Sequence, residues 1–298
     1  MQFTEDDDLI DIRYDNVFKA VFTKNTPESQ GALSKLVSTL INREVTIIAI
    51  LTNEPPIENL RDRQLRFDIN CRAINGELIN VEMSLCPNPF EPIRLEFHAS
   101  KLFIGQDIRG VDKSYDDLKD SYQITILANE TFFLDDSIFH SFEYFDPENQ
   151  ISLNGRSRII TIELSKSDTI MEKTINEMTP AEQWVVFFEY LTNKAKREKI
   201  NEIINRQEGI AMASQVLLTI SKDDIERARL ESELKYELDL QSKITHAKKQ
   251  GMKLSDNKWQ NVVADKDAKL ADKEAELADK EAELALLRSQ IAELQSKT

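Results

Sequence analysis

The sequence predicts an α/β protein in which a mixed sheet flanked by helices precedes a helical region and a C-terminal coiled-coil helix. Up to about residue 170, short apolar runs with strand character alternate with amphipathic helical segments. From there to about residue 255 the apolar residues recur at helical spacing alone. From residue 265 a seven-residue pattern repeats. We therefore expect three parts, at residues 1–170, 171–255 and 256–298.

The first part is expected to open with two helices. Residues 15–22 and 29–42 carry apolar side chains at helical spacing, which gives each helix one apolar face. β-Branched residues at 44–51 indicate a strand, which the prolines of "NEPP" end. The elements expected next are a hairpin at 66–85, a helix at 93–108, and strands at 121–132, 137–146 and 157–166.

The hairpin "RFDINCRAINGELINVEMSL", residues 66–85, alternates apolar and polar residues in both halves. A three-residue turn, Asn75-Gly76-Glu77, pairs Cys71 with Val81 and keeps one face of the hairpin apolar. A two-residue turn would place a charge on that face, so we favour the three-residue turn.

On the polar face, the favoured register sets Asp68 opposite Ser84 and diagonally across from Glu82, with backbones about 7–8 Å apart. Two carboxylates at that spacing can bind one hard cation, because Mg²⁺ prefers oxygen ligands and often takes only one or two from the protein. Most solvent-facing hairpin faces carry acids that do no chemistry. From the alternation alone, a metal site and an ordinary solvent-facing pair of acids both stay open.

The net charge of −15 argues against diffuse attraction to nucleic acid. Residues 265–298 hold nine acidic and six basic residues, a charge of −3, so the rest of the chain carries −12. Nucleic acid binding would therefore need a local basic surface or a divalent ion. Arg61, Arg63 and Arg66, ahead of the first hairpin strand, form one candidate surface. Residues 194–199 form a second, which we interpret more readily as a solvated face.

Nothing in the composition indicates secretion or a membrane. The acidic start "MQFTEDDDLIDIRYD" lacks the character of a signal or transit peptide. No apolar run approaches the ~20 residues of a membrane span. The two cysteines, Cys71 and Cys86, have no zinc-ligand spacing with histidines. We expect a soluble cytoplasmic protein with both thiols free.

The later parts are expected to be helical. Thr179 and Pro180 are a typical helix cap and first residue for a helix at 179–193. Helical patterns follow at 207–221 and 223–240.

The tail carries a narrow apolar seam. Leu270, Leu277 and Leu284 fall one per heptad, while Lys273 and Lys280 occupy the second core position. A weak coiled coil that forms a homo-oligomer and a lone charged helix are therefore equally open.

Several segments, in their order along the chain, carry a family resemblance. They are "YDNVFKAVF", the hairpin, "RLEFHASKLFIGQDIRGVDKSYDDLKDSYQITIL", "FHSFEYFD", "RSRIITIELSK", "EQWVVFFEYL" and "ELDLQSKITHAKKQGMK". The chain resembles the Rpn family of recombination-promoting nucleases and transposases, within the PD-(D/E)xK nuclease superfamily. The resemblance runs from about residue 11 to 255 and excludes the heptad tail. It implies a restriction-endonuclease-like core.

The resemblance implies a divalent-metal-dependent DNA endonuclease that uses Mg²⁺, with Mn²⁺ as an alternative ion. Asp68 and Glu82 would hold the metal, which activates a water for phosphodiester hydrolysis. Asp15 matches an acid of the family and would add a contact. Lys19, one turn later, would steady that acid or contact phosphate; an ordinary surface pair at i,i+4 is equally open.

One position departs from the family pattern. The superfamily places lysine two residues after the glutamate, and this family usually places glutamine, but Ser84 stands here. Serine is shorter and uncharged, so it would reach the attacking water only through another water. Arg94 and Lys101 match basic positions of the family helix and share one helix face, with His98 between them.

We therefore expect Arg94, Lys101, Lys19 and Arg66 to contact DNA, and Lys101 to supply catalytic charge that Ser84 lacks. The alternative is a catalytically degenerate family member. Such a protein would act as a DNA- or protein-binding factor assembled through its coiled coil.

Overall fold

The computed structural model describes residues 2–52, 67–85, 90–106, 108, 112–129, 131–223 and 226–231, and short stretches between 249 and 288. The chain divides into two compact units, residues 1–234 and 235–298, which are described separately below. The three-part division predicted from the sequence stays a prediction.

The first unit is built on a mixed six-stranded sheet with the order β1-β2-β3-β4-β8-β5. Its strands are β1 (Ile47–Ile50), β2 (Ile69–Ala73), β3 (Leu78–Ser84), β4 (Ser121–Leu127), β5 (Phe139–Phe142) and β8 (Ser157–Glu163). β3, β4 and β8 are parallel, whereas β1–β2, β2–β3 and β5–β8 pair antiparallel. β6 (Phe145–Asp146) and β7 (Ile151–Ser152) form a separate small hairpin.

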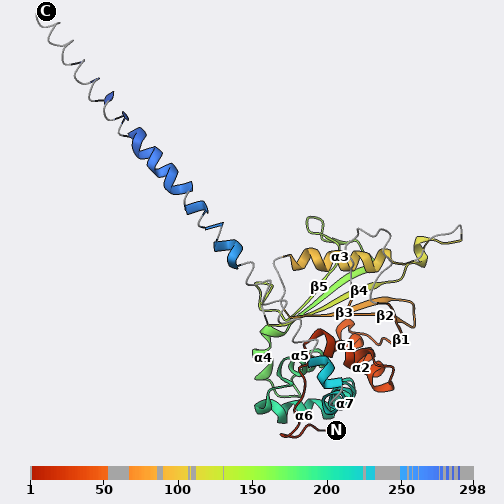
Figure 1. The fold of residues 1–298 in the computed structure, drawn as a ribbon. Coiled ribbons are helices and arrows are strands. Elements are labelled where there is room, and N and C mark those ends of the chain that lie inside the picture. The colour runs from red at the N-terminus through yellow and green to blue at the C-terminus, as the bar shows by residue number, and fades with distance from the viewer. Residues whose placement is uncertain are drawn as a thin grey trace, which may run out of the picture. The chain divides into compact units, whose positions relative to one another are not determined.

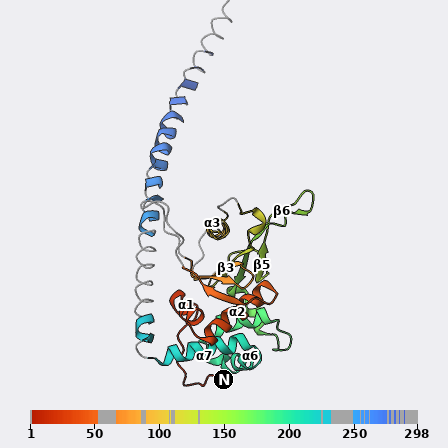
Figure 2. The same cartoon turned by 90° about the vertical axis from the view of Figure 1, so that its right-hand side faces the viewer.

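Helices cover both faces of this sheet. They are α1 (Asp15–Thr23), α2 (Pro27–Ile41), α3 (Glu91–Ile104), α4 (Asp168–Met171), α5 (Pro180–Tyr190), α6 (Arg197–Arg206) and α7 (Glu208–Lys222). Short 3₁₀ turns are η1 (Tyr115–Asp117), η2 (Leu164–Lys166) and η3 (Lys194–Lys196). α3 lies on one side of the sheet, and α1, α2, α6 and α7 lie on the other (Figure 1; Figure 2). The predicted α/β fold, a mixed central sheet flanked by helices, is confirmed.

One apolar core joins the sheet to the helices on the second side. Phe18 and Phe22 of α1 are fully buried, as their helical spacing predicts. Phe22 packs 6.1 Å from the ring of Trp184 on α5, and Trp184 stacks 5.4 Å from Phe188. α5 begins as predicted, with Thr179 accepting a hydrogen bond from the N–H of Glu182. The later helices therefore share their core with the first part of the chain.

The α2 and α7 helices approach each other closely. A Cβ atom added to Gly209 of α7 would lie 2.5 Å from Cβ of Lys35 and 3.1 Å from the ring of Trp184. A side chain at this position would push α7 away from α2, so glycine sets the helix spacing.

The hairpin register differs from the predicted one. Cys71 pairs with Ile79, not with Val81, so the predicted pairing is wrong by two residues. The loop is Ile74-Asn75-Gly76, closed by a 3.0 Å hydrogen bond from the N–H of Ala73 to the carbonyl of Glu77. Gly76 has φ 92°, which only glycine adopts readily.

This correction leaves each face of the hairpin unchanged, because a shift of two residues preserves the alternation. It moves the acids, however. Continuing the register one residue beyond the Ile69–Val81 pair places Asp68 directly opposite Glu82. Ser84 therefore does not face Asp68, as the predicted register required.

The second unit is helical wherever the structure describes it. Leu270, Leu277 and Leu284 are 59%, 60% and 53% exposed, so the heptad seam of this helix is open in the single chain. A C-terminal helix is confirmed, while its pairing into a coiled coil stays a prediction. Among the described residues of the chain, no helix is both long and apolar enough to cross a membrane. Cys71 is buried and free, and Cys86 lies outside the described residues.

Candidate active site

The face of the sheet beneath α3 is polar and buried at its centre. Glu82 of β3 is in register with Thr125 of β4 and Thr161 of β8, so these side chains share that face. Glu82 is only 2% exposed. The hairpin face that alternation alone would leave in solvent is instead covered by a helix. A buried carboxylate needs hydrogen-bond partners or opposite charges.

Glu82 has three such partners. Nδ1 of His98 lies 2.5 Å from Oε1, and the amide of Asn80 donates to the same oxygen at 2.9 Å. Arg94 donates from Nη1 to Oε2 at 3.0 Å. Burial alone would raise the pKa of Glu82, but the contacts with His98, Arg94 and Asn80 outweigh it and lower that pKa. Glu82 is therefore ionised at neutral pH.

A chain of buried amides continues from Glu82 into the next strand. The amide nitrogen of Asn80 also donates to Oε1 of Gln123 at 2.8 Å, and Gln123 donates to Oγ1 of Thr125 at 3.0 Å. All three side chains are fully buried. They fix the amide of Asn80 that orients Glu82.

Asp68 lies in a second group of charges. Nζ of Lys19 lies 3.1 Å from Oδ1 of Asp68 and 2.7 Å from Oδ2 of Asp15. The N–H of Met83 donates to Oδ2 of Asp68 at 3.2 Å. Burial raises the pKa of Asp68 to about 8, and the charges of Asp15 and Glu82 add to the rise while Lys19 opposes it. Asp15, Asp68 and Glu82 thus lie close together at one end of the hairpin, where burial and the proximity of the other two acids keep Asp68 protonated.

The residues present fit a divalent ion with few protein ligands. Within the described ranges, no three His, Cys, Asp or Glu side chains form a cluster that could hold a metal. Asp68, the residue before β2, and Glu82 of β3 nevertheless lie close enough for the charge of one to raise the pKa of the other. Mg²⁺ often takes only one or two carboxylates and keeps its other ligands as water. Oδ1 of Asp15 is buried and has no hydrogen-bond partner among the residues that the structure describes, so it is an acceptor that a hydrated cation could satisfy.

The remaining predicted site residues are less closely gathered. Ser84 is half-buried at the end of β3, and its carbonyl accepts from the N–H of Ala128 at 2.8 Å. Lys101 lies seven residues after Arg94 on the continuous helix α3, so the two share one side of it as predicted, but Lys101 is exposed, with Nζ 5.8 Å from the ring centre of Phe97. Arg66 lies outside the described residues.

Sequence reasoning missed one further buried acid at this edge of the sheet. Glu163 is fully buried at the end of β8, where the N–H groups of Phe132 and Phe133 donate to it and Lys166 pairs with it. The available signal was an acid that ends the apolar run "SRIITIE", with a lysine three residues later.

The fold and this acidic centre define a class of protein: an α/β chain with a PD-(D/E)xK-type core. The chain belongs to the PD-(D/E)XK nuclease family transposases, since the model of that family matches residues 12–247. The family predicted from the sequence is confirmed, and the protein is related to nucleases and transposases. No curated protein and no solved structure gives a significant match.

Proposed function

We propose that this protein is a DNA endonuclease that depends on a divalent metal, with Asp68 and Glu82 holding Mg²⁺ or Mn²⁺. The observation that carries the proposal is the register of the hairpin, which, continued one residue beyond the Ile69–Val81 pair, sets Asp68 opposite Glu82 in a chain of the PD-(D/E)XK family. When bound, the ion supplies an activated water and stabilises charge on the phosphate.

In this proposal the protein's own groups set the geometry. His98, Asn80 and Arg94 hold the Glu82 carboxylate in one orientation. Arg94 is 34% exposed at its side chain, so it also meets solvent and can contact a phosphate. It brings to Glu82 the positive charge that Ser84 cannot supply.

DNA contacts are proposed for the basic groups that reach solvent around this centre. Lys19 is 28% exposed while it bridges Asp15 and Asp68. Lys101 is exposed on α3. Together with Arg94, and with Arg66 from the sequence prediction, they offer a local basic surface on an acidic protein. Such contacts predict binding that weakens steeply with salt.

The test is cleavage of supercoiled plasmid by the full chain with Mg²⁺, with Mn²⁺ and with chelator. We expect cutting that requires metal and is lost in Glu82→Gln. Glu77→Gln is the matched control, because Glu77 is a buried, arginine-paired acid of the same hairpin outside the proposed site. Equal cutting by the native protein and Glu82→Gln would contradict the proposal.

A second candidate function is a binding factor that has lost cleavage. It is favoured by Ser84 and by the occupation of both Glu82 oxygens by protein donors. Ser84→Gln separates the two: cutting restored by this change alone marks a nuclease disabled at one position. No cutting by either form supports binding alone.

We further propose that the heptad helix joins two copies of the chain. Its leucines are more than half exposed in the single chain, and a second seam of the same kind would cover them. Two active sites in one dimer would suit a cut through both DNA strands.

A further inference from the structure

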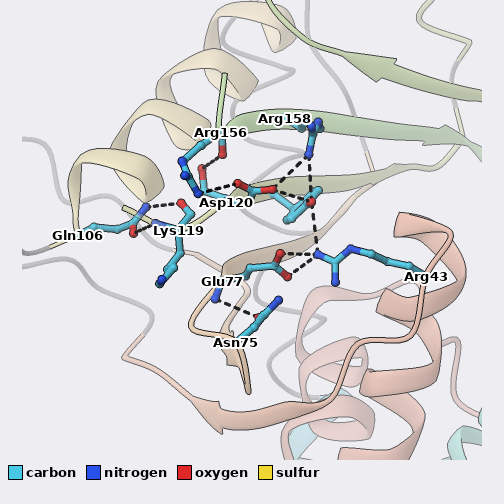
Figure 3. A network of polar contacts seen from close by, with 10 residues as sticks. Arg43, Asn75, Glu77, Gln106, Lys119, Asp120, Arg156 and Arg158 are labelled. Atoms are coloured by element: carbon cyan, nitrogen blue, oxygen red, sulfur yellow. Dashed lines mark hydrogen bonds and ion pairs between the residues drawn. The ribbon is translucent and has the colours of Figure 1, made fainter. Parts of the chain in front are cut away.

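A second polar centre lies on the opposite face of the sheet from Glu82. Tyr122 is three residues before Thr125 on β4, so its side chain points to the other face, about 10 Å along the strand. Arg43, just after α2, and Arg158 of β8 each lie 5.8 Å from the centre of its ring. They donate to its hydroxyl at 3.4 Å and 3.1 Å. Both guanidinium groups thus converge on one hydroxyl oxygen (Figure 3).

These side chains line a cavity of about 580 Å³. The end of α2 forms one wall, strands β4, β8 and β5 form another, and Ala181 of α5 lies at its border. Arg43 and Arg158 both line it, and its lining holds no aspartate or glutamate among the residues that the structure describes. In a protein with a net charge of −15, such a lining makes this cavity a candidate anion site.

The acids that balance the arginines stand outside the cavity. Arg43 donates to both oxygens of Glu77 at 2.5 Å, which anchors it firmly. Arg158 is held more loosely, 3.5 Å from Asp120 and 3.7 Å from Glu143. Glu77, Asp120 and Glu143 therefore already balance the charge of the two arginines, and Asp120 also accepts from the Tyr122 hydroxyl at 3.4 Å. An anion in the cavity would be held by the donors of the two guanidinium groups that face it. Because the guanidinium fork matches phosphate geometry, phosphate is the anion that fits best.

The rest of the cavity is apolar. Leu40, Ile41, Phe139 and Ile160 line it beside the arginines. A bare phosphate would leave this surface uncovered, whereas a flat ring attached to the phosphate would cover it. The volume lies within the range of about 300–1,000 Å³ typical of small-molecule sites.

The two helix ends around the cavity act in opposite directions on an anion. The C-terminal end of α2 is its negative end, which is partly offset because the carbonyls of Ser38 and Thr39 accept from the N–H groups of Arg43 and Asn42. Ala181 is the second residue of α5, where a backbone N–H has no partner within its helix. The positive end of α5 therefore adds to the field of the arginines.

We propose that this cavity binds a nucleoside monophosphate, with the phosphate on Arg43 and Arg158 and the base on the apolar wall. The proposal stands independently of nuclease activity, since it uses no residue of the acidic site.

The test is calorimetric titration of the full chain with dAMP, deoxyadenosine and inorganic phosphate. Chelator is present throughout, so that metal at Asp68 and Glu82 plays no part. We expect dAMP to bind more tightly than phosphate, and deoxyadenosine to bind about tenfold more weakly than dAMP or worse. Phosphate binding as tightly as dAMP would overturn the nucleotide assignment. No binding of any probe at millimolar concentration would overturn the site itself.

A matched pair of variants locates the binding. Arg158→Gln should weaken dAMP binding by about tenfold or more, because it removes one charged donor. Arg156→Gln is the control, since Arg156 also pairs with Asp120, at 3.6 Å, but does not line the cavity. Equal loss in both variants, or in neither, would overturn the assignment. If Arg158→Gln fails to fold, Arg158→Lys keeps the charge without the fork and should still bind dAMP more weakly than the native chain.

Discussion

The two faces of the central strands are both buried, yet they carry opposite chemistry. Toward α1 and α2 the strands present apolar side chains, namely Ile79, Val81, Ile124 and Ile126. Toward α3 the intervening positions are Asn80, Glu82, Gln123 and Thr125. Because side chains alternate along a strand, one strand builds a core and a site at once. Burial alone does not separate the two roles, whereas the partners of each side chain do.

The largest effects on activity and stability should come from substituting Glu82 and Val81, which are neighbours in β3 and face opposite sides of the sheet. Glu82→Gln should reduce metal-dependent plasmid cutting to background, because the proposed metal loses a charged ligand. Val81→Ala should cost about 2 kcal/mol of folding free energy through the cavity it leaves, with cutting largely kept. Urea unfolding and cleavage of both variants measure this. If Glu82→Gln lost more folding free energy than Val81→Ala, the division of the two faces into a core face and a site face would be contradicted.

A second prediction concerns pH. The carboxyl of Asp68 has an ordinary pKa of 3.8, raised to about 8 in the fold. Between these values the folded state keeps a proton that the unfolded chain has lost. The stability of the metal-free protein should therefore fall as pH rises from about 4 to about 8, by up to about 1 kcal/mol per pH unit.

Asp68→Asn should flatten that slope in urea unfolding with chelator. Mg²⁺ should stabilise the native chain near pH 8 but not this variant, because the ion binds the ionised carboxylate. Asp146→Asn, a change at an exposed acid, serves as control and should keep the native slope. A native chain whose stability is flat across this range would exclude the raised pKa.

The third prediction tests how tightly the helical layer behind the apolar face is packed. Gly209→Ala should cost about 1–3 kcal/mol, because the new Cβ meets Lys35 and Trp184. Gly251→Ala is the control, since a Cβ there meets no atom of the described residues within 4 Å. Thermal unfolding of the full chain distinguishes them. Equal thermal unfolding midpoints for Gly209→Ala and Gly251→Ala would show that α7 can move away from α2 without loss of stability.

The smallest effect on folding is expected in the second unit. Leu277→Lys should leave the unfolding of the first unit unchanged and weaken self-association, seen by sedimentation equilibrium. Ala271→Lys places the same charge off the heptad seam and should keep the native association. A native chain that is monomeric at every concentration would refute pairing through this helix.

The sequence pattern predicted both faces of the hairpin but not its register. Turns at Asn75-Gly76-Glu77 and at Ile74-Asn75-Gly76 differ by two residues in pairing, and both keep the same side chains together. A shift of two residues leaves every side chain on the same face, so the alternation of apolar and polar residues cannot reveal it. The backbone conformation of the turn decides it, and that is why Asp68 faces Glu82 and not Ser84.

Long-range contacts were beyond the sequence for a different reason. Helical spacing put Arg94 and His98 near one face of α3, but only the packing of α3 on the sheet brings both to Glu82. Likewise Arg43 and Tyr122 are 79 residues apart in sequence, and no local pattern links them. The elements were predictable, while the meeting of their side chains depends on tertiary structure.

The hydrogen-bonded chain from Glu82 through Asn80 to Gln123 on β4 also bears on how long Glu82 keeps its orientation. β4 lies between two parallel neighbours and is buried along its whole length. Backbone amides of buried central strands exchange their hydrogens mainly through global unfolding, so we expect the amides of β4 to be among the slowest to exchange in the first unit. Glu82 is hydrogen-bonded to Asn80, which is hydrogen-bonded to Gln123 of this strand. We therefore expect Glu82 to keep its orientation during local openings that leave β4 folded.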